Sequence, residues 1–299
     1  MLKEKNRQKT VTGTTAITLI ADANESYRVK NIEVYGPTTD YATITVDRLV
    51  VGYYRVGGNL GNHLPFRDEV GVKRSLLGIL IERGIFRPIP IPSGMTLTIT
   101  GVAVAGAITT ITYDVYDKDD VKPNEPNGIE SRDYDLIQYG RYSTTLADGD
   151  NLYATQQTDN SFPPFPFGDV VPAKHTFTLR GIVATPVHDG GTAPARVQDT
   201  QRMRLVQDRT VLFDEDRLGF PFFASAVSVV TLGVGGVASF TGNQSDVDAA
   251  EPYFFDPPKS FPAGEELNVY VTTSLSSGNA LIAAADAEVG FIFNVRKDG

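Results

Sequence analysis

A short pattern that occurs twice constrains the fold of this chain more than any other feature. It consists of Pro, a small residue and Gly, then two further residues, Leu, one residue and a β-branched residue. The pattern occupies Pro92–Ile99 and returns at Pro262–Val269, at a constant offset of 170 residues. Pro and Gly set a turn, and the residues after it alternate between two faces as they do in a strand. The repeat predicts two related β-domains.

Further matches follow in the same order along the chain. Residues 27–32 (Tyr-Arg-Val-Lys-Asn-Ile) align with residues 177–182 (Phe-Thr-Leu-Arg-Gly-Ile) at an offset of 150, and the dipeptide Asp47-Arg48 returns as Asp208-Arg209. The last match, at an offset of 180, pairs Ile111, Tyr113 and Val115 with Phe291, Phe293 and Val295. Offsets that grow along the chain indicate loop insertions between strands of constant length.

The composition supports an all-β protein. A length of 299 residues favours about two domains, and 41% hydrophobic with 21% charged residues is typical of a folded chain. The β-formers Val, Ile, Thr, Tyr and Phe are frequent, while 28 Gly and 18 Pro separate them at short intervals. Because no window shows a helical stripe, we predict short strands that form a sandwich or barrel in each half of the chain.

The turn and strand signals divide the chain into four segments. These are a basic N-terminal arm (1–12), a first β-domain (13–118), a linker (119–132) that is charged and rich in Pro and turn residues, and a second β-domain (133–299). In the first domain the expected strands are Ala16–Ile20, Tyr27–Tyr35, Ala42–Tyr54, Leu76–Ile81, Met95–Val104 and Ile108–Tyr116. In the second they are Tyr134–Tyr142, Asn151–Gln156, Thr176–Ala184, Arg202–Phe213, Leu267–Thr272 and Glu288–Val295.

The basic arm has two interpretations. Lys3, Lys5, Arg7 and Lys9 outnumber the single acid Glu4. The arm is either a solvated, frayed terminus or an assembly arm that docks on a neighbouring subunit, an anionic membrane or packaged nucleic acid. A net charge of −9 argues against nucleic-acid binding by the rest of the protein.

One uncharged run, from Leu218 to Ser245, is long enough to suggest a membrane span. Its alternating β-branched residues on either side of Gly235-Gly236 indicate a buried hairpin instead. The Ser, Thr, Gly and Pro in the run also make it too polar for a good spanning helix.

Residues that commonly carry chemistry are sparse. The three histidines, His63, His175 and His188, form no metal-binding pair, and no cysteine is present. Neither a Gly-x-Ser-x-Gly motif nor a phosphate-binding loop occurs, so we predict no enzyme, no catalytic residue and no small-molecule substrate.

Two chemical alternatives stay open. Carboxylates gather in loops at Asp117, Asp119 and Asp120, at Asp214, Glu215 and Asp216, and at Asp246, Asp248 and Glu251. We expect these to be solvated charges, with calcium as the one cofactor that such loops could bind. A sugar-stacking platform could come from Tyr53, Tyr54, Tyr139, Tyr142 and Tyr153, although the chain has no Trp.

Two β-domains in tandem, each closing with a Pro-small-Gly turn, a strand, a loop and a final strand, resemble the double jelly-roll or stacked-barrel capsid proteins of icosahedral viruses, including bacteriophages. The resemblance covers Thr15–Tyr116 and Phe177–Val295. It implies an all-β fold of two tandem jelly-roll-like barrel or sandwich domains, and subunits that form trimers within a lattice. The basic arm would then point inward, toward membrane or genome.

The resemblance leads to a prediction of function. We predict a virion structural protein, a capsid subunit whose partners are copies of itself and neighbouring capsid proteins. The alternatives are a head decoration or turret protein, a carbohydrate-binding or carbohydrate-active β-sandwich protein, and a calcium-dependent adhesin. Pro92, Gly94, Pro262 and Gly264 are then structural corners that hold turn geometry, not binding residues.

Overall fold

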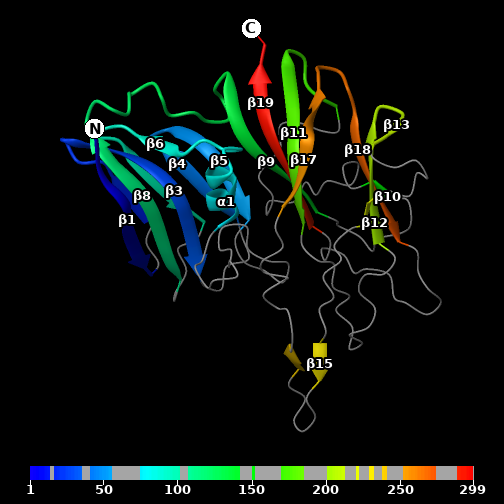
Figure 1. Ribbon diagram of the computed structural model, residues 1–299, viewed down its shortest axis with the longest axis horizontal. Coiled ribbons are helices and arrows are strands. Elements are labelled where there is room, and N and C mark those ends of the chain that lie inside the picture. Colours follow the sequence, from blue (N-terminus) through cyan, green and yellow to red (C-terminus); the bar gives the residue numbers. More distant parts are fainter. Residues whose placement is uncertain are drawn as a thin grey trace. The chain divides into compact units, whose positions relative to one another are not determined.

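The computed structural model consists almost entirely of β-strands (Figure 1). It describes residues 1–13, 17–35, 41–55, 75–101, 107–141, 150–151, 170–184, 201–212, 220–221, 229–231, 238–240, 252–273 and 288–298. The chain divides into two compact units. The first comprises Met1–Ile137 with Asn294–Lys297, and the second comprises Gln138–Phe293 with Asp298–Gly299.

Two four-stranded antiparallel sheets build the first unit, in the orders β1-β8-β3-β6 and β2-β7-β4-β5. The strands of the first sheet are β1 (Leu2–Thr12), β8 (Ile108–Asp117), β3 (Glu25–Tyr35) and β6 (Ile89–Ile91). Those of the second are β2 (Ile17–Ile20), β7 (Thr96–Thr100), β4 (Tyr41–Val46) and β5 (Leu49–Arg55). Numbered along the chain, the orders are 1-8-3-6 and 2-7-4-5, which describe an eight-stranded jelly roll.

The second half of the chain repeats these orders as β9-β19-β11-β17 and β10-β18-β12-β13. The strands are β9 (Asp133–Arg141), β10 (Asp150–Asn151), β11 (His175–Ala184), β12 (Gln201–Gln207), β13 (Thr210–Val211), β17 (Tyr253–Phe261), β18 (Leu267–Thr273) and β19 (Glu288–Lys297). β9 therefore corresponds to β1, β10–β13 to β2–β5, and β17–β19 to β6–β8. The prediction of an all-β fold with jelly-roll-like domains is confirmed.

Each unit carries an insertion between its fifth and sixth strands. In the first unit this is the helix α1 (Leu76–Glu82), and in the second it includes β14 (Phe220–Pro221), β15 (Val229–Thr231) and β16 (Ala238–Phe240). β15 and β16 pair antiparallel, which confirms the hairpin predicted around Gly235-Gly236. Within the described residues, no helix is long and apolar enough to cross a membrane.

The prediction of a strand at Leu76–Ile81 is wrong, because these residues form α1. All six are buried, and a helix that is apolar on every side shows no stripe that distinguishes it from a buried strand. The helix begins where the Ser75 side chain accepts a hydrogen bond from the Gly78 amide. Asn31 Oδ1 accepts in turn from the Ser75 hydroxyl at 2.6 Å, which anchors this cap to β3.

Residues 1–12 are not a separate arm. Leu2–Thr12 is the edge strand β1, and it pairs antiparallel with β8 from Leu2 opposite Tyr116 to Thr12 opposite Ile108. The expectation of a frayed or docking arm fails because backbone pairing satisfies this segment despite its polar sequence.

Residues 119–132 are not a linker either, since they belong to the first unit. Val121 is buried, and Glu125 forms an ion pair with Arg28 at 2.6 Å. The Ile129 amide donates to the Val50 carbonyl at 3.0 Å, so this segment lies against the edge of β5. The boundary between the units follows Ile137 instead.

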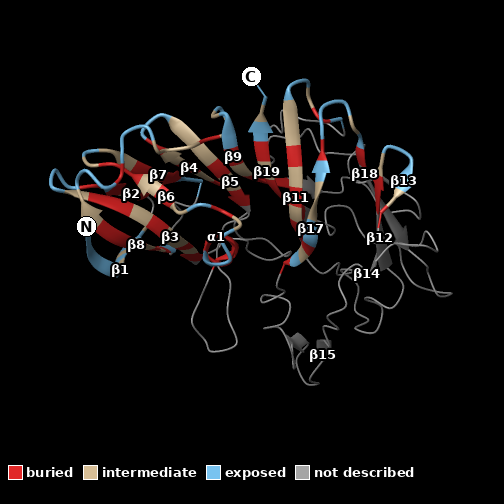
Figure 2. Ribbon diagram, turned by 45° about the horizontal axis from the view of Figure 1, so that its top comes forward, coloured by how far each residue is buried: buried red, intermediate tan, exposed pale blue. Residues whose placement is uncertain are grey.

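Buried and half-buried residues alternate along the strands (Figure 2), as expected for sheets with one face in a core. Leu97 and Ile99 of β7 are fully buried, as are Phe291 and Phe293 of β19. These residues are the inward positions of the sequence repeat. The repeat therefore encodes core positions as well as turns.

Candidate functional site

The first repeated corner is a tight turn at the start of β7. Gly94 has a φ of +79°, a left-handed conformation that favours glycine. The Met95 amide donates to the Pro92 carbonyl at 3.0 Å, and the Gly94 amide donates to the Ala21 carbonyl at 3.0 Å. The corner is thus closed internally and fixed to the segment that follows β2.

The second corner reproduces this geometry. Gly264 has a φ of +87°. The Glu265 amide donates to the Pro262 carbonyl at 3.2 Å, and the Gly264 amide donates to the Val171 carbonyl at 2.9 Å. Because the backbone groups of both corners are used within the fold, the four corner residues have a structural role.

An aspartate in each unit locks the corner to a neighbouring hairpin. Asp47 has a φ of 51°; its amide donates to the Thr96 carbonyl at 2.8 Å, and its Oδ1 accepts from the Thr96 amide at 2.9 Å. Asp208 has a φ of 52° and makes both bonds with Glu266 at 3.0 Å. The sequence places Asp47-Arg48 inside a strand, but in the structure it is the turn between β4 and β5. Asp tolerates left-handed backbone because its short side chain bonds to nearby backbone groups.

Replacing Asp47 with Ala should lower the free energy of unfolding by about 1.5 kcal/mol, and Asp208→Ala should do the same. Each change removes an acceptor and leaves a residue that is strained at positive φ. Asn keeps an acceptor oxygen and tolerates this backbone, so Asp47→Asn is the matched control. Chemical denaturation of the three variants measures the effect; equal losses for Ala and Asn at position 47 would contradict the lock.

The four basic residues of the predicted assembly arm do not form a common anion-binding surface. Lys3 Nζ pairs with Asp117 Oδ1 at 3.1 Å and donates to the Asn24 carbonyl at 2.9 Å. Arg7 pairs with Glu25 Oε2 at 2.9 Å and with Glu4. Lys5 is exposed, and Lys9 is half-buried. Two of the four cations are therefore already neutralised by acidic residues of the first unit.

β1 has the features of an edge strand protected against strand addition. Its register shifts between Leu2 and Arg7, where Asn6 has a φ of 56°. The Asp114 carboxylate holds this bulge by accepting from the Asn6 amide at 2.9 Å. Arg7 and Lys9 lie opposite the buried residues Tyr113 and Ile111, so charged residues occupy the inward face of the edge. Bulges and inward-pointing charges both discourage pairing with a further strand.

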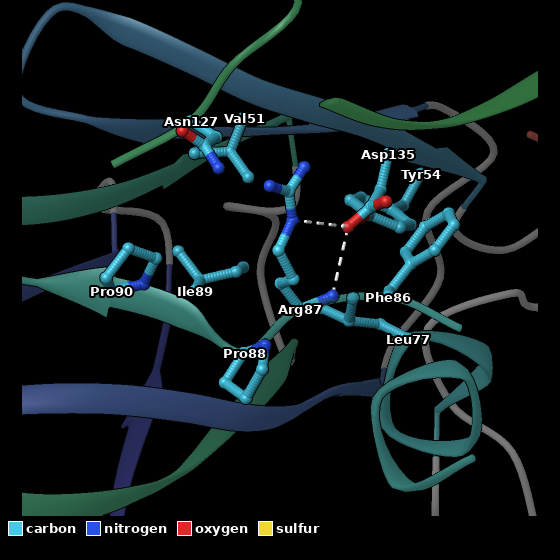
Figure 3. A pocket seen from close by; sticks show the side chains of 10 residues that line it. All are labelled: Val51, Tyr54, Leu77, Phe86, Arg87, Pro88, Ile89, Pro90, Asn127 and Asp135. Atoms are coloured by element: carbon cyan, nitrogen blue, oxygen red, sulfur yellow. Dashed lines mark hydrogen bonds and ion pairs between the residues drawn. The ribbon is translucent and has the colours of Figure 1, made fainter. Parts of the chain in front are cut away.

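A small pocket in the first unit surrounds the Arg87–Asp135 pair (Figure 3). The Arg87 amide donates to Asp135 Oδ2 at 2.9 Å, and Arg87 Nε lies 3.6 Å from the same oxygen. Asn294 donates to Asp135 Oδ1 and, at 3.2 Å, to the Ile85 carbonyl. The volume available to water is about 30 Å³, room for about two water molecules. The pocket is a structural ion-pair site and is too small for an organic substrate.

Burial raises the pKa of the Asp135 carboxyl, while the Arg87 backbone amide, the Arg87 charge and Asn294 lower it without cancelling this effect. Burial also raises the pKa of the neighbouring Tyr54 phenol, which is fully enclosed. In both groups, burial favours the neutral form more in the folded protein than in water. Ionisation of Asp135 is therefore less favourable in the native state than in the unfolded chain.

This pKa shift predicts a pH dependence of stability. A carboxyl with a raised native pKa releases its proton more easily when unfolded, so its contribution to the free energy of unfolding falls as pH rises above about 4, the unfolded value. Asp135→Asn lacks this titration. Urea unfolding across the acid range should show the stability of the Asn variant, relative to wild type, increasing with pH. A constant or shrinking difference would contradict the prediction.

Within the described part of the chain, the other predicted chemical residues do not form a site. His175 begins β11, and its Nδ1 lies 2.9 Å from the Ala173 carbonyl, as expected of a turn residue. Asp117 pairs with Lys3, and the described residues contain no group of three acidic or histidine side chains that could hold a metal ion. The remaining candidates, which are His63, His188, the acidic residues at 214–216 and 246–251, Tyr142 and Tyr153, lie outside the described residues.

Sequence reasoning missed the polar residues that organise the first unit: Asn31, Arg87, Asp114 and Asp135. Each acts across a long sequence separation, as Asn31 does with Ser75 and Arg87 does with Asp135. One signal was available, because Asp114 is the one charged residue in the predicted strand Ile108–Tyr116. A polar residue in such a position indicates a buried partner without identifying it.

Comparisons with known proteins leave the family undefined. No protein-family model and no curated protein sequence match the chain. Among solved structures, the chain is similar to a peptide-N(4)-(N-acetyl-beta-D-glucosaminyl)asparagine amidase, with 10% sequence identity and a TM-score of 0.32 over 98% of this chain and 90% of that chain. A TM-score this low supports no inference about function.

Proposed function

We propose that this chain is a virion structural protein, a capsid subunit that assembles with copies of itself into an icosahedral shell. The observation that carries the proposal is the tandem duplication of one jelly roll. The strand orders 1-8-3-6 and 2-7-4-5 occur twice, and the corners at Gly94 and Gly264 repeat the same backbone hydrogen bonds. Jelly rolls build many viral shells, and two equivalent rigid bodies in one subunit suit packing into a closed, symmetric lattice.

Fold alone is an argument from analogy, since jelly rolls also form lectins and enzymes. The residues of the first unit favour a structural role over these. Among its described residues, the pocket beside Arg87 and Asp135 has room for about two water molecules, and Arg28 and Lys30 form ion pairs with Glu125 and Asp114. A site that binds a sugar or reacts with a substrate needs unpaired polar groups in a larger hollow.

The proposal includes the partners and the location of the protein. The partners are further copies of the chain, as a homotrimer, together with neighbouring capsid proteins, and the location is the virion. The proposal no longer includes a mobile basic arm directed at membrane or genome, because residues 2–12 are held in β1. Assembly would then rest on contacts between rigid surfaces.

Sedimentation velocity over a wide concentration range, followed by electron microscopy, tests the proposal. We expect discrete oligomers that grow into closed shells or shell fragments as concentration rises. A strict monomer that binds glycans in an array would overturn the proposal in favour of a carbohydrate-binding protein. A large loss of thermal stability on calcium chelation would favour the adhesin instead.

A further inference from the structure

The edges of both sheets in the first unit are poor sites for adding a strand from a neighbour. β1 is bulged and charged, as described above. β6 has only three residues, and Pro90 at its centre has no amide to donate. β2 has only four residues. Residues 128–131 lie along β5, where the Ile129 amide donates a hydrogen bond to the Val50 carbonyl. Among the described strands of this unit, the outer faces of the sheets are therefore better suited than the edges to contact with a neighbouring copy.

The two outer faces differ sharply in charge. On the sheet β1-β8-β3-β6, Arg28 pairs with Glu125 at 2.6 Å and Lys30 pairs with Asp114 at 2.9 Å. These ion pairs give that face a fixed, hydrated surface. Covering it would require removing water from paired charges, which the contact would have to offset.

The centre of the outer face of the sheet β2-β7-β4-β5 is uncharged among its described side chains, and the register places Arg55, opposite Tyr41, at one end of the face. Thr98 at the centre lies opposite Thr18 on one side and Thr45 on the other, while Thr100 lies opposite Thr43. We call this surface the threonine face; its residues are Thr18, Ile20, Thr43, Thr45, Tyr53, Thr96, Thr98 and Thr100. Ile20 is 56% exposed, which adds an apolar contact to a row of β-branched side chains.

The fold itself does not require this face to be neutral. The duplication places Arg204 of the second unit at the position of Thr43, and Glu266 at the position of Thr96. The same strand positions can thus carry charge in this architecture. The absence of charge among the described side chains at the centre of this face is a property of the first unit's sequence, and depletion of charge is characteristic of the cores of protein interfaces.

We propose that the threonine face packs against the same face of a second copy in the assembled protein, an inference that rests on the proposed self-assembly. A chain with a net charge of −9 repels its own copies, and the uncharged centre of the threonine face lets two copies approach without burying unpaired charge there. Like faces meet through a two-fold axis, which makes the contact self-complementary.

The size of the face defines what the contact does. Four strands about 4.8 Å apart and about five residues long, at about 3.3 Å per residue, cover about 300 Å². A stable pair of proteins buries about 800 Å² on each partner. The threonine face is too small to hold a dimer by itself, so we expect it to act as one of several contacts in a shell.

Cross-linking tests the contact directly, because the chain has no cysteine and a single substitution introduces the only thiol. Thr98→Cys places it at the centre of the threonine face. Thr110→Cys is the matched control: it is also a half-buried threonine on a central strand, but its outward side belongs to the charged sheet. Packed sheets lie about 10 Å apart, so a bis-maleimide of about that span should join two copies of Thr98→Cys. Equal or stronger cross-linking of Thr110→Cys in assembled protein would overturn the proposal.

Charge insertion separates this inference from the proposed function. Thr98→Arg should raise the concentration needed for assembly about tenfold or more, since each contact would bury two like charges. Thr110→Arg should leave that concentration unchanged, and circular dichroism with thermal melting confirms that both variants fold. If wild type and Thr98→Arg assemble equally, the threonine face is not the contact, while the proposed function stands. If wild type never assembles, the proposed function is wrong.

Discussion

Replacing Gly128 with Ala should lower the free energy of unfolding by about 3 kcal/mol, the range of a severe steric conflict in a packed region. A Cβ at this position would lie 2.1 Å from the Val50 carbonyl oxygen and 2.7 Å from Leu49 Cγ. The oxygen belongs to the backbone of β5 and cannot move without displacing that strand. It also accepts the Ile129 amide, so relief of the overlap would break this bond as well.

Chemical denaturation of Gly128→Ala beside Gly94→Ala measures the effect. Gly94 is the control because it needs its positive φ, but a Cβ added there would have no other atom within 4 Å. Gly94→Ala should lower the free energy of unfolding by about 1 kcal/mol, because it introduces backbone strain alone. A loss below about 0.5 kcal/mol for Gly128→Ala would mean that residues 128–131 lift off β5 at little cost. That outcome would restore the idea of a loosely attached linker.

Local patterns are sufficient to predict both corners and many of the strands of this fold. Leu97 and Ile99 alternate with threonine, and both are buried, so binary patterning places β7 correctly. Gly94 and Gly264 are predicted to hold turn geometry, and both have positive φ. These features depend on neighbouring residues along the chain, and a single sequence contains all the information they need.

Features that depend on partners distant in sequence could not be predicted. β1 has a polar, basic sequence that shows no strand signal, and it becomes a strand because β8 satisfies its backbone. α1 resembles a buried strand in sequence, because its residues 76–81 carry no polar side chain and its cap at Ser75 is completed by Asn31, 44 positions earlier. In both cases tertiary contacts override the local preference.

The candidate surfaces also combine features that are visible in the sequence with features that depend on distant contacts. The sequence identifies the basic residues of β1, but only the structure shows that Arg7 and Lys3 are paired with acids and that Asp114 holds the bulge. The threonine face could not be recognised from one strand. It arises from the register that brings Thr18, Thr98 and Thr45 side by side from three strands.

Asp135→Ala should lower the free energy of unfolding by about 3 kcal/mol, because this carboxylate joins three segments of the first unit. It accepts from the Arg87 amide and from Asn294, and it pairs with the Arg87 guanidinium. Its side chain is only 15% exposed, so water cannot fully replace these bonds when the carboxylate is removed. The Arg87 amide would be left without its acceptor in a site with room for about two water molecules.

Asp133→Ala is the matched control for this prediction. Asp133 lies two residues away on β9 and also pairs with Arg87, at 3.4 Å, but its side chain is 62% exposed. An exposed pair of this kind contributes between about 0 and 1 kcal/mol, so the control should lose far less than Asp135→Ala. Urea denaturation at neutral pH provides both values. Equal losses would show that Arg87 gains the same stabilisation from either acid, and that burial of Asp135 does not determine the strength of the site.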